Sequence, residues 1–292
     1  MTLNEAPYWK NGFAVVTTCS EEQRGLSARP MWDELNKFDR GRFSGTNSLI
    51  FKPAWADAEI EWWCEHMFKE HGLYPDDFGE LLSASVQGPK VVTLSDLDVK
   101  ANSFVIHVKG RPNEIGEAWW HQRKLDLSGP IFEAQRMWIP KPEHGQGRGR
   151  LLMADLIDTA ARLGVRRITL EADDVGRYAW ACLGFLPDRA SWNYHIRLEG
   201  LGRLARSRNE LKPEVYHAYQ DVLSNSNPLL IRNVIQWKQL VSSAELYGPD
   251  GEPMPIAIGK AILLETGARW YGEFDLEDPE TMRIFNEYVG RK

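Results

Sequence analysis

The sequence predicts an α+β protein in which a central β-sheet is flanked by helices. A strand-like stretch at residues 131–139 leads through a glycine-rich loop into a helix-like stretch at residues 151–163, and a second strand-like stretch follows at residues 165–171. Further segments with the period of a strand or of a helix occur along the rest of the 292 residues. This length exceeds that of most single domains and leaves room for a second, smaller one.

The first part of the chain is expected to supply strands and one long helix. Residues 12–20 are rich in β-branched and aromatic side chains, which favour a strand. Residues 53–71 are predicted to be helical, because their apolar side chains recur at helical spacing and a proline is accepted in a first turn. A strand is predicted at residues 103–109, and residues 111–130 are expected to hold another strand and a turn.

The loop before the helix at residues 151–163 predicts a binding site for phosphate. Gly145, Gly147 and Gly149 remove side chains where the backbone must turn. Backbone N–H groups can then converge on an anion at the start of a helix. Arg148 and Arg150 add positive charge. Farther along, Gly164 is expected to cap the end of the helix.

Two common nucleotide-binding motifs do not fit this loop. A Walker loop requires Lys and then Ser or Thr after its last glycine, but Arg150 and Leu151 follow Gly149. The dinucleotide-binding fingerprint also fails, because its third glycine would fall at Arg150 or at Leu152. The phosphate is therefore expected to belong to a different kind of ligand.

The loop resembles the acyl-CoA-binding motif of the GNAT superfamily of N-acetyltransferases, R/Q-x-x-G-x-G/A. The motif reads His144-x-x-Gly147-x-Gly149 in this sequence, and Gly145 and Gln146 also match common choices of the family. His144 stands where Arg or Gln is usual. Histidine at this position is expected either to weaken the contact with phosphate or to make that contact depend on pH.

A second family pattern, N-x-x-A-x-x-x-Y-x-x-x-G-F, follows at the expected distance. Its end is matched by Gly184 and Phe185, while Asp173, Gly176 and Trp180 depart from it. In the family the tyrosine of this pattern often protonates the departing CoA thiolate. An indole N–H is not a useful acid near neutral pH, so Trp180 cannot take that role.

The resemblance, which covers residues 131–198, implies the acyl-CoA N-acyltransferase fold with a mixed, mostly antiparallel sheet. It implies this domain over residues 1–198 and leaves a smaller α+β accessory domain over residues 199–292. The cofactor implied is acetyl-CoA, with its pyrophosphate on the loop and its pantetheine arm along the preceding strand. The residues expected to bind it are Met137, Trp138, Ile139, His144, Gly145, Gln146, Gly147, Arg148, Gly149 and Arg150.

The reaction implied is direct transfer of an acetyl group from CoA to a primary amine of a small molecule or of a protein. An alkylammonium must first lose a proton, so a base is expected near the acceptor. Glu133 lies where the family often places this base, and Glu171 and Asp173 are alternatives. Tyr178 and Tyr194 are candidates for the missing acid. A backbone N–H is expected to polarise the thioester.

Other functions stay open on the sequence. A longer acyl-CoA or acyl carrier protein could serve as the donor. The departure at Trp180 also leaves open a module without catalytic activity that senses CoA or binds a partner. Trp120 and Trp138 are candidates for the lining of an aromatic substrate cleft.

Composition narrows the partners. The net charge of −6 argues against general nucleic-acid binding. No apolar run approaches the ~20 residues that cross a bilayer, and the N-terminus does not resemble a signal peptide. Three widely spaced cysteines favour a reducing, cytoplasmic compartment. No metal is assigned, since His66 and His71 near Cys64 are expected to be structural.

The C-terminal part is expected to add elements beyond the family core. Residues 192–198 are predicted to form a closing strand, and the basic segment at residues 199–211 a domain boundary. Helices are then predicted at residues 214–223, 229–240 and 279–289, a turn at 248–253, and strands at 256–265 and 269–274. Such an addition can complete a homodimer or narrow a substrate cleft, and the sequence leaves both open.

Overall fold

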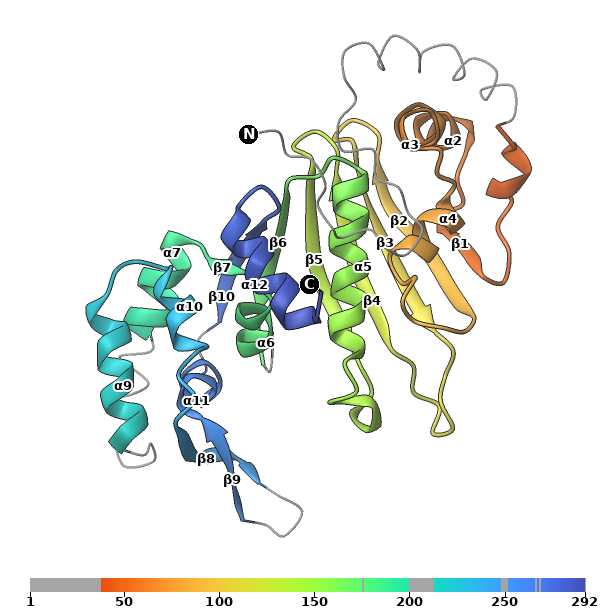
Figure 1. The fold of residues 1–292 in the computed structure, drawn as a ribbon. Coiled ribbons are helices and arrows are strands. Elements are labelled where there is room, and N and C mark those ends of the chain that lie inside the picture. Colours follow the sequence, from red (N-terminus) through yellow and green to blue (C-terminus); the bar gives the residue numbers. More distant parts are fainter. Residues whose placement is uncertain are drawn as a thin grey trace. The chain divides into compact units, whose positions relative to one another are not determined.

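The computed structural model describes residues 38–174, 176–199, 213–247, 252–265, 267 and 269–291 (Figure 1). Contacts divide the chain into two compact units. Unit 1 runs to Arg166 and includes residues 290–292, and unit 2 runs from Arg167 to Val289. The domain boundary predicted after residue 198 adjoins residues that are not described, and it stays a prediction. Both units combine helices with strands that are mostly antiparallel, so the α+β class is confirmed.

Unit 1 contains a sheet with the strand order β1-β2-β3-β4-β5. Its strands are β1 (Leu49–Lys52), β2 (Lys90–Asp98), β3 (Ser103–Gly110), β4 (Trp120–Asp126) and β5 (Ile131–Trp138). Strands β1 and β2 are parallel, and the other neighbours are antiparallel. The strands predicted at residues 103–109 and 131–139 and within residues 111–130 are confirmed. Strand β2 was not predicted, and the strand predicted at residues 12–20 lies outside the described residues.

The helix predicted at residues 53–71 is confirmed but begins later. It consists of α2 (Asp57–Trp63), a π-helical segment η3 (Cys64–Phe68) and α3 (Lys69–His71). The backbone of Ala56 is still extended, so helical geometry starts only at Asp57. A short helix α4 (Pro75–Leu81), which was not predicted, follows.

Helix α5 (Arg148–Arg162) confirms the predicted amphipathic helix. Its apolar face is buried through Leu152, Leu156 and Ala160, each 0% exposed. Gly164 follows the helix with a φ of +67°, the left-handed conformation expected of a helix C-cap.

One face of the unit 1 sheet is covered by helices, and α5 runs along the strands in Figure 1. Phe78 of α4 packs against Phe104 of β3 and Phe132 of β5 with ring centroids 5.7 and 6.2 Å apart. Arg123 of β4 lies with Nη2 3.8 Å from Sδ of Met153 on α5. The side chains that alternate with these point to the opposite face of the sheet.

Arg291, near the end of the chain, also belongs to unit 1. Its guanidinium forms a two-pronged ion pair with the Asp158 carboxylate of α5, with both N–O distances at 2.7 Å. The chain therefore leaves unit 1 after Arg166 and returns to it at Gly290.

Unit 2 contains three strands of one sheet and a separate hairpin among its described residues. Strand β10 (Trp270–Asp275) lies between β6 (Arg167–Ala172) and β7 (Leu186–Pro187) and is antiparallel to both. The hairpin pairs β8 (Leu240–Tyr247) with β9 (Pro253–Ala257). The helical segments are α6 (Gly176–Cys182), α7 (Arg189–Ser191), η5 (Trp192–Glu199), α9 (Pro213–Ser224), α10 (Leu230–Val234), α11 (Ile258–Glu265) and α12 (Pro279–Val289).

The predicted closing strand at residues 192–198 is wrong, because this segment forms the π-helical η5. Its buried residues Trp192 and Ile196 are four positions apart and share one helical face. The side chains of Asn193 and Arg197, also four apart, are joined by a hydrogen bond of 2.7 Å.

The strand predicted at residues 256–265 is wrong beyond Ala257, where helix α11 begins. Most of α11 is buried, so its apolar run lacks the period that would distinguish a helix from a strand. The helix predicted at residues 229–240 ends at Val234. The helices predicted at 214–223 and 279–289 and the strands predicted at 165–171 and 269–274 are confirmed.

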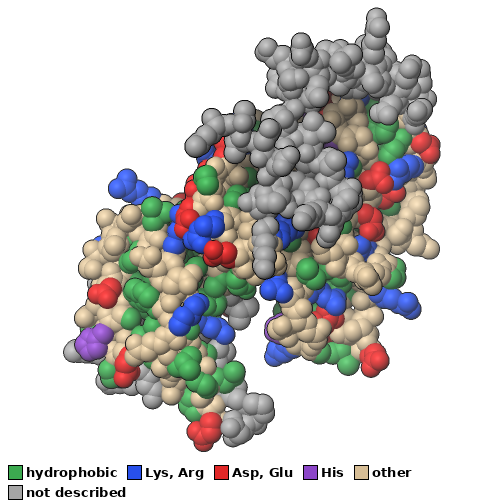
Figure 2. Space-filling model, viewed as in Figure 1, with side chains coloured by type: hydrophobic (Ala, Val, Ile, Leu, Met, Phe, Trp, Pro, Cys, Tyr) green, Lys and Arg blue, Asp and Glu red, His purple; other side chains and the backbone are tan. Residues whose placement is uncertain are grey.

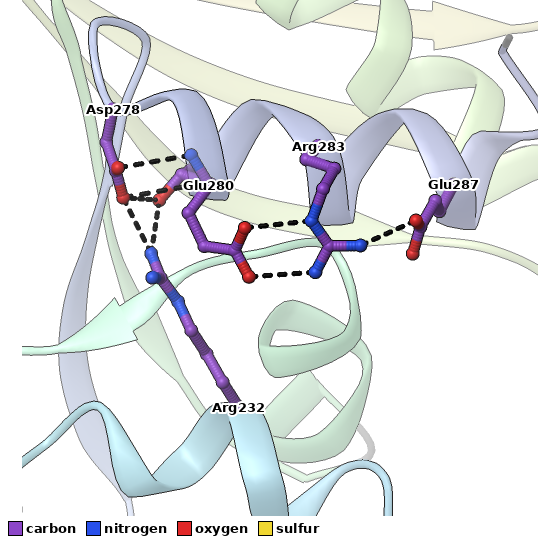
Figure 3. Close-up of polar contacts among 6 residues, drawn as sticks. Arg232, Asp278, Glu280, Arg283 and Glu287 are labelled. Atoms are coloured by element: carbon purple, nitrogen blue, oxygen red, sulfur yellow. Dashed lines mark hydrogen bonds and ion pairs between the residues drawn. The ribbon is translucent and has the colours of Figure 1, made fainter.

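A polar cluster holds the start of α12 (Figure 3). The Asp278 side chain accepts hydrogen bonds from the hydroxyl of Thr281 at 2.7 Å and from Nη2 of Arg232 on α10 at 2.7 Å. These bonds lower the pKa of Asp278 to about 2. Farther along the helix, Arg283 pairs with Glu280 and Glu287.

Candidate functional site

The predicted phosphate loop connects β5 to α5 within unit 1. After Trp138 the chain forms one 3₁₀ turn, η4 (Lys141–Glu143), and α5 begins at Arg148. Gly145 and Gly147 have φ values of +77° and +80°, which residues with a Cβ rarely adopt. The backbone therefore requires glycine at both positions.

Gly149 has a different role from the other two glycines. A Cβ at this position would lie 3.1 Å from Cδ1 of Ile139 and 3.7 Å from Cε of Met137. The absence of a side chain thus lets the first turn of α5 approach the end of β5 closely.

The start of α5 has the features of an anion site. Gly147 is the N-cap and has no side chain that could accept a hydrogen bond from the first turn. The N–H of Leu151 donates to the Gly147 carbonyl at 3.0 Å, so the N–H groups of Arg148 and Gly149 come before the first hydrogen bond of the helix. The first turn holds no acidic residue. Its partial positive charge can therefore attract an anion.

The polar side chains of the loop bind within the loop itself. Nε2 of His144 donates to the Ile139 carbonyl at 2.8 Å, and Nε2 of Gln146 donates to the Pro142 carbonyl at 2.9 Å. Arg148 forms an ion pair with Glu143 at 2.8 Å. These side chains shape the loop. The N–H groups of Glu143, His144 and Gln146 also donate to carbonyls of the loop. The contact for a ligand is therefore confined to the backbone N–H groups at the start of α5.

The predicted aromatic pair lies together on the sheet. Trp120 and Trp138 are direct cross-strand partners of β4 and β5. Trp138 is 45% exposed, and Met137 is paired in the same way with His121.

The predicted acidic residues lie in different surroundings. Glu133 is exposed on β5, opposite Lys124 of β4. In unit 2, Glu171 at the end of β6 and Asp173 beyond it both pair with Arg269, at 3.8 and 3.0 Å. The structure therefore brings Glu171 and Asp173 together, and it places Glu133 on the strand that leads into the loop.

The two predicted tyrosines belong to unit 2. Tyr178 lies on α6 and interacts with Cys182. Burial raises the pKa of Tyr178, and the interaction with Cys182 raises it further. A higher pKa makes its hydroxyl a weaker acid toward a thiolate. Tyr194 on η5 is 58% exposed, with its ring centroid 5.2 Å from that of His195.

The departures at Gly176 and Trp180 are physically linked. A Cβ at Gly176 would lie 2.7 Å from Nε1 of Trp180. The Trp180 ring packs edge-on against Phe185, with centroids 5.6 Å apart. With the Trp180 indole in this position, only glycine fits at position 176.

Two buried polar side chains of β4, Arg123 and His121, were not predicted from the sequence. Arg123 is 1% exposed and donates from Nη1 to the carbonyls of Gln122 and Arg136 at 3.0 and 2.9 Å. Burial lowers its pKa to about 9. His121 is also 1% exposed, and neither of its ring nitrogens has a hydrogen-bond partner among the described residues. Both residues occupy alternate positions along β4 together with Leu125, which is buried. This alternation is the sequence pattern from which their burial could have been predicted.

Asp155, on the buried face of α5, was also missed. It is 4% exposed, and burial raises the pKa of its carboxyl group. An acidic residue within an amphipathic helix gave no sign that it would be buried. Its partner, Ser85, is distant in the sequence.

Charged side chains of both signs are interspersed over the molecule as seen in Figure 2. Within the described ranges, no cluster of three or more His, Cys, Asp and Glu side chains could hold a metal ion. In the same residues, no helix is both long and apolar enough to cross a membrane.

Comparisons of the chain with protein-family models, with curated proteins and with solved structures found no match.

Proposed function

We propose that the protein is an acetyl-CoA-dependent N-acetyltransferase that acts on a primary amine of a small molecule or a protein. The observation that carries this proposal is the connection between β5 and α5. Left-handed Gly145 and Gly147 lead into a helix start that has neither a side-chain cap nor an acidic first turn. This geometry suits the pyrophosphate of CoA, and it occurs in the segment that resembles the family motif.

The order of elements around the loop supports the same proposal. Strand β5, the loop, helix α5, strand β6 and helix α6 follow one another, as the two family patterns together require. The loop would hold the pyrophosphate through the backbone N–H groups at the start of α5. Arg150 would add positive charge, and Arg148 would contribute its charge only by exchanging its ion pair with Glu143 for one with the phosphate. The end of β5, at Met137 and Trp138, would hold the pantetheine arm.

The chemistry needs a thioester and a deprotonated amine. CoA supplies an acetyl group with a thiolate as its leaving group. As the amine nitrogen bonds to the carbonyl carbon, the carbon–sulfur bond breaks and the amine loses a proton. Glu133, which lies on β5, is our candidate to accept that proton.

Titration calorimetry with acetyl-CoA, followed by thiol release over a panel of amines, tests this function. The key variant is Gly147→Val, because valine cannot adopt the left-handed backbone without strain. We expect it to weaken acetyl-CoA binding at least tenfold. The matched control is Gly116→Val, which changes another left-handed glycine (φ +80°) in a turn of unit 1. Equal affinity of both variants and the unaltered protein would overturn the assignment of the loop.

A second candidate function is a CoA-binding module without transferase activity. The observation that favours it is Trp180, which packs against Phe185 where the family often has its catalytic tyrosine. A donor with a longer acyl chain, or acyl carrier protein, is a further alternative. Binding of acetyl-CoA without thiol release for any amine, together with release from a longer acyl-CoA, would favour that donor. Binding without release from any donor would favour the module.

A further inference from the structure

The face of the unit 1 sheet that points away from α4 and α5 carries the exposed ring of Trp138, the half-buried rings of Trp120 and His107, and several cations. We call it the open face. Its first row of cross-strand partners is Val91, Lys109, Trp120 and Trp138, taken from β2, β3, β4 and β5. The next row includes His107 of β3 and Arg136 of β5.

Aromatic rings from three strands meet on the open face. The His107 and Trp120 ring centroids are 5.3 Å apart, and Trp138 is the direct partner of Trp120. Of the tryptophans that the structure describes, Trp138 has the most exposed side chain, whereas Trp63 and Trp192 are 0% exposed. An exposed indole beside a second one offers a surface on which a planar ring can stack.

The cations of this face form no ion pair within the part of the chain that the structure describes. Lys109, Lys124 and Arg136 form no ion pair with any described residue, although Glu133 lies directly across from Lys124. By contrast, Arg42 pairs with the carboxylate of Asp77 and Lys90 with that of Glu80. Among the described residues, Lys109 and Arg136 thus have no carboxylate partner, and in a protein of net charge −6 their charge is available to an anionic ligand.

A cavity of about 540 Å³ adjoins the first row. It lies where β2 begins and β3 ends, and Val91, Lys109 and Arg111 are among its lining residues. This volume falls in the usual range for small-molecule sites. Lys90, which also lines it, is already paired with Glu80, so Lys109 and Arg111 are the cations left for a ligand.

We infer that the open face binds the acceptor amine of the proposed acetyltransferase, and that this acceptor is an aromatic amine whose ring carries an anionic group. The ring stacks on Trp120 and Trp138, and the anionic group lies in the cavity beside Lys109 and Arg111. The surrounding cations repel an alkylammonium, whereas an arylamine is uncharged near neutral pH. This inference rests on the proposed function for the identification of the ligand as an acceptor.

The test compares three ring amines by titration calorimetry on the full chain. The probes are 4-aminobenzoate, 4-aminophenyl phosphate and aniline, which share a ring and an amine but differ in the anionic group. We expect both acids to bind at least tenfold more tightly than aniline. The relative affinity of the carboxylate and phosphate probes identifies which anionic group the site prefers. Equal affinity for all three probes, or no binding of any, overturns the inference.

The variants locate the site. Lys109→Ala should remove the difference in affinity between the acids and aniline. Trp138→Ala should lower the affinity for all three probes at least tenfold. Trp138→Phe retains a ring and should restore most of the affinity, which separates stacking from a folding defect. Lys100→Ala removes an exposed lysine of the turn between β2 and β3 and should change nothing. Full affinity in both Lys109→Ala and Trp138→Ala overturns the inference.

Titration with acetyl-CoA on the same sample separates this inference from the proposed function. If acetyl-CoA binds and thiol is released with amines other than the ring acids, the acceptor assignment fails while the acetyltransferase stands. If the ring acids bind through Lys109 and Trp138 but acetyl-CoA does not, the proposed function fails, and with it the description of this ligand as an acceptor. Acetylation of 4-aminobenzoate that is lost in Lys109→Ala supports both.

Discussion

The carboxylate of Asp155 on α5 accepts two hydrogen bonds from Ser85, one from its N–H at 2.9 Å and one from its hydroxyl at 2.6 Å. Ser85 follows α4, so this contact joins α5 to another part of unit 1. Helix α5 begins at the candidate phosphate loop. The position of the loop therefore depends partly on this buried carboxylate.

Ser85→Ala should lower the free energy of unfolding by about 1–2 kcal/mol, because a hydrogen bond to a charged, buried acceptor is lost. Urea denaturation monitored by circular dichroism measures the change. The control is Ser128→Ala, which removes an exposed hydroxyl that donates to the Ala101 carbonyl. The free energy of unfolding of this control should stay within about 0.5 kcal/mol of that of the unaltered protein. Equal losses in the two variants would contradict the special role of Ser85.

His121 should make the protein less stable in mild acid. Burial, with the nearby Arg123 charge, lowers its pKa well below 6.5. The unfolded chain therefore takes up a proton below pH 6.5 that the folded protein does not, and stability is lost as the pH falls. His121→Leu removes this proton uptake, so its loss of stability between pH 7 and pH 5 should be smaller by about 1 kcal/mol or more. Identical pH dependence in urea denaturation would refute this role of His121.

Arg123 should respond differently to two substitutions. Arg123→Met removes a buried charge while it retains an unbranched apolar chain, which offsets the loss of two hydrogen bonds. We expect its stability to lie within about 1 kcal/mol of the unaltered protein. Arg123→Ala leaves a cavity as well and should cost about 3 kcal/mol. Guanidinium denaturation distinguishes them, and equal losses would show that the hydrogen bonds, and not the volume, decide.

The cluster at the start of α12 predicts a second acid-dependent loss. The pKa of Asp278 is lowered to about 2, so its contribution is present above the ordinary value near 3.8 and is lost as the pH falls through about 2. Asp278→Asn should cost about 1 kcal/mol at pH 7, since part of the site is solvent-exposed. Glu287→Gln, which breaks an exposed pair with Arg283, should cost less than about 0.5 kcal/mol. Thermal denaturation at pH 7 compares them, and a larger loss in Glu287→Gln would count against the prediction.

The sequence predicted correctly those helices and strands in which the buried residues recur at regular helical or strand spacing. Helices α5 and α12 have one apolar face each, and their helical spacing gave their type correctly. Segment η5 misled, because Trp192, Tyr194 and Ile196 alternate along the sequence while the buried pair is the one at helical spacing. Helix α11 is buried on most sides, so no period could identify it.

In the candidate site, too, local features could be predicted from the sequence, but contacts between distant residues could not. The need for glycine at positions 145 and 147 is a property of the local backbone, so the sequence located it. The arrangement of Lys109, Trp120 and Trp138 in one row depends on cross-strand register, which is set by the packing of the whole sheet. The pairing of Asp173 with Arg269 joins positions far apart in the chain, and no local pattern encodes it.

The pairing of Arg291 with Asp158 bears on the order in which the protein is made. Asp158 belongs to α5, but its partner is synthesised only after every residue of unit 2. During translation α5 must therefore remain without this contact while a whole compact unit emerges between the two residues. Loops of this length close slowly, so the ion pair between Arg291 and Asp158 is expected to form late in folding.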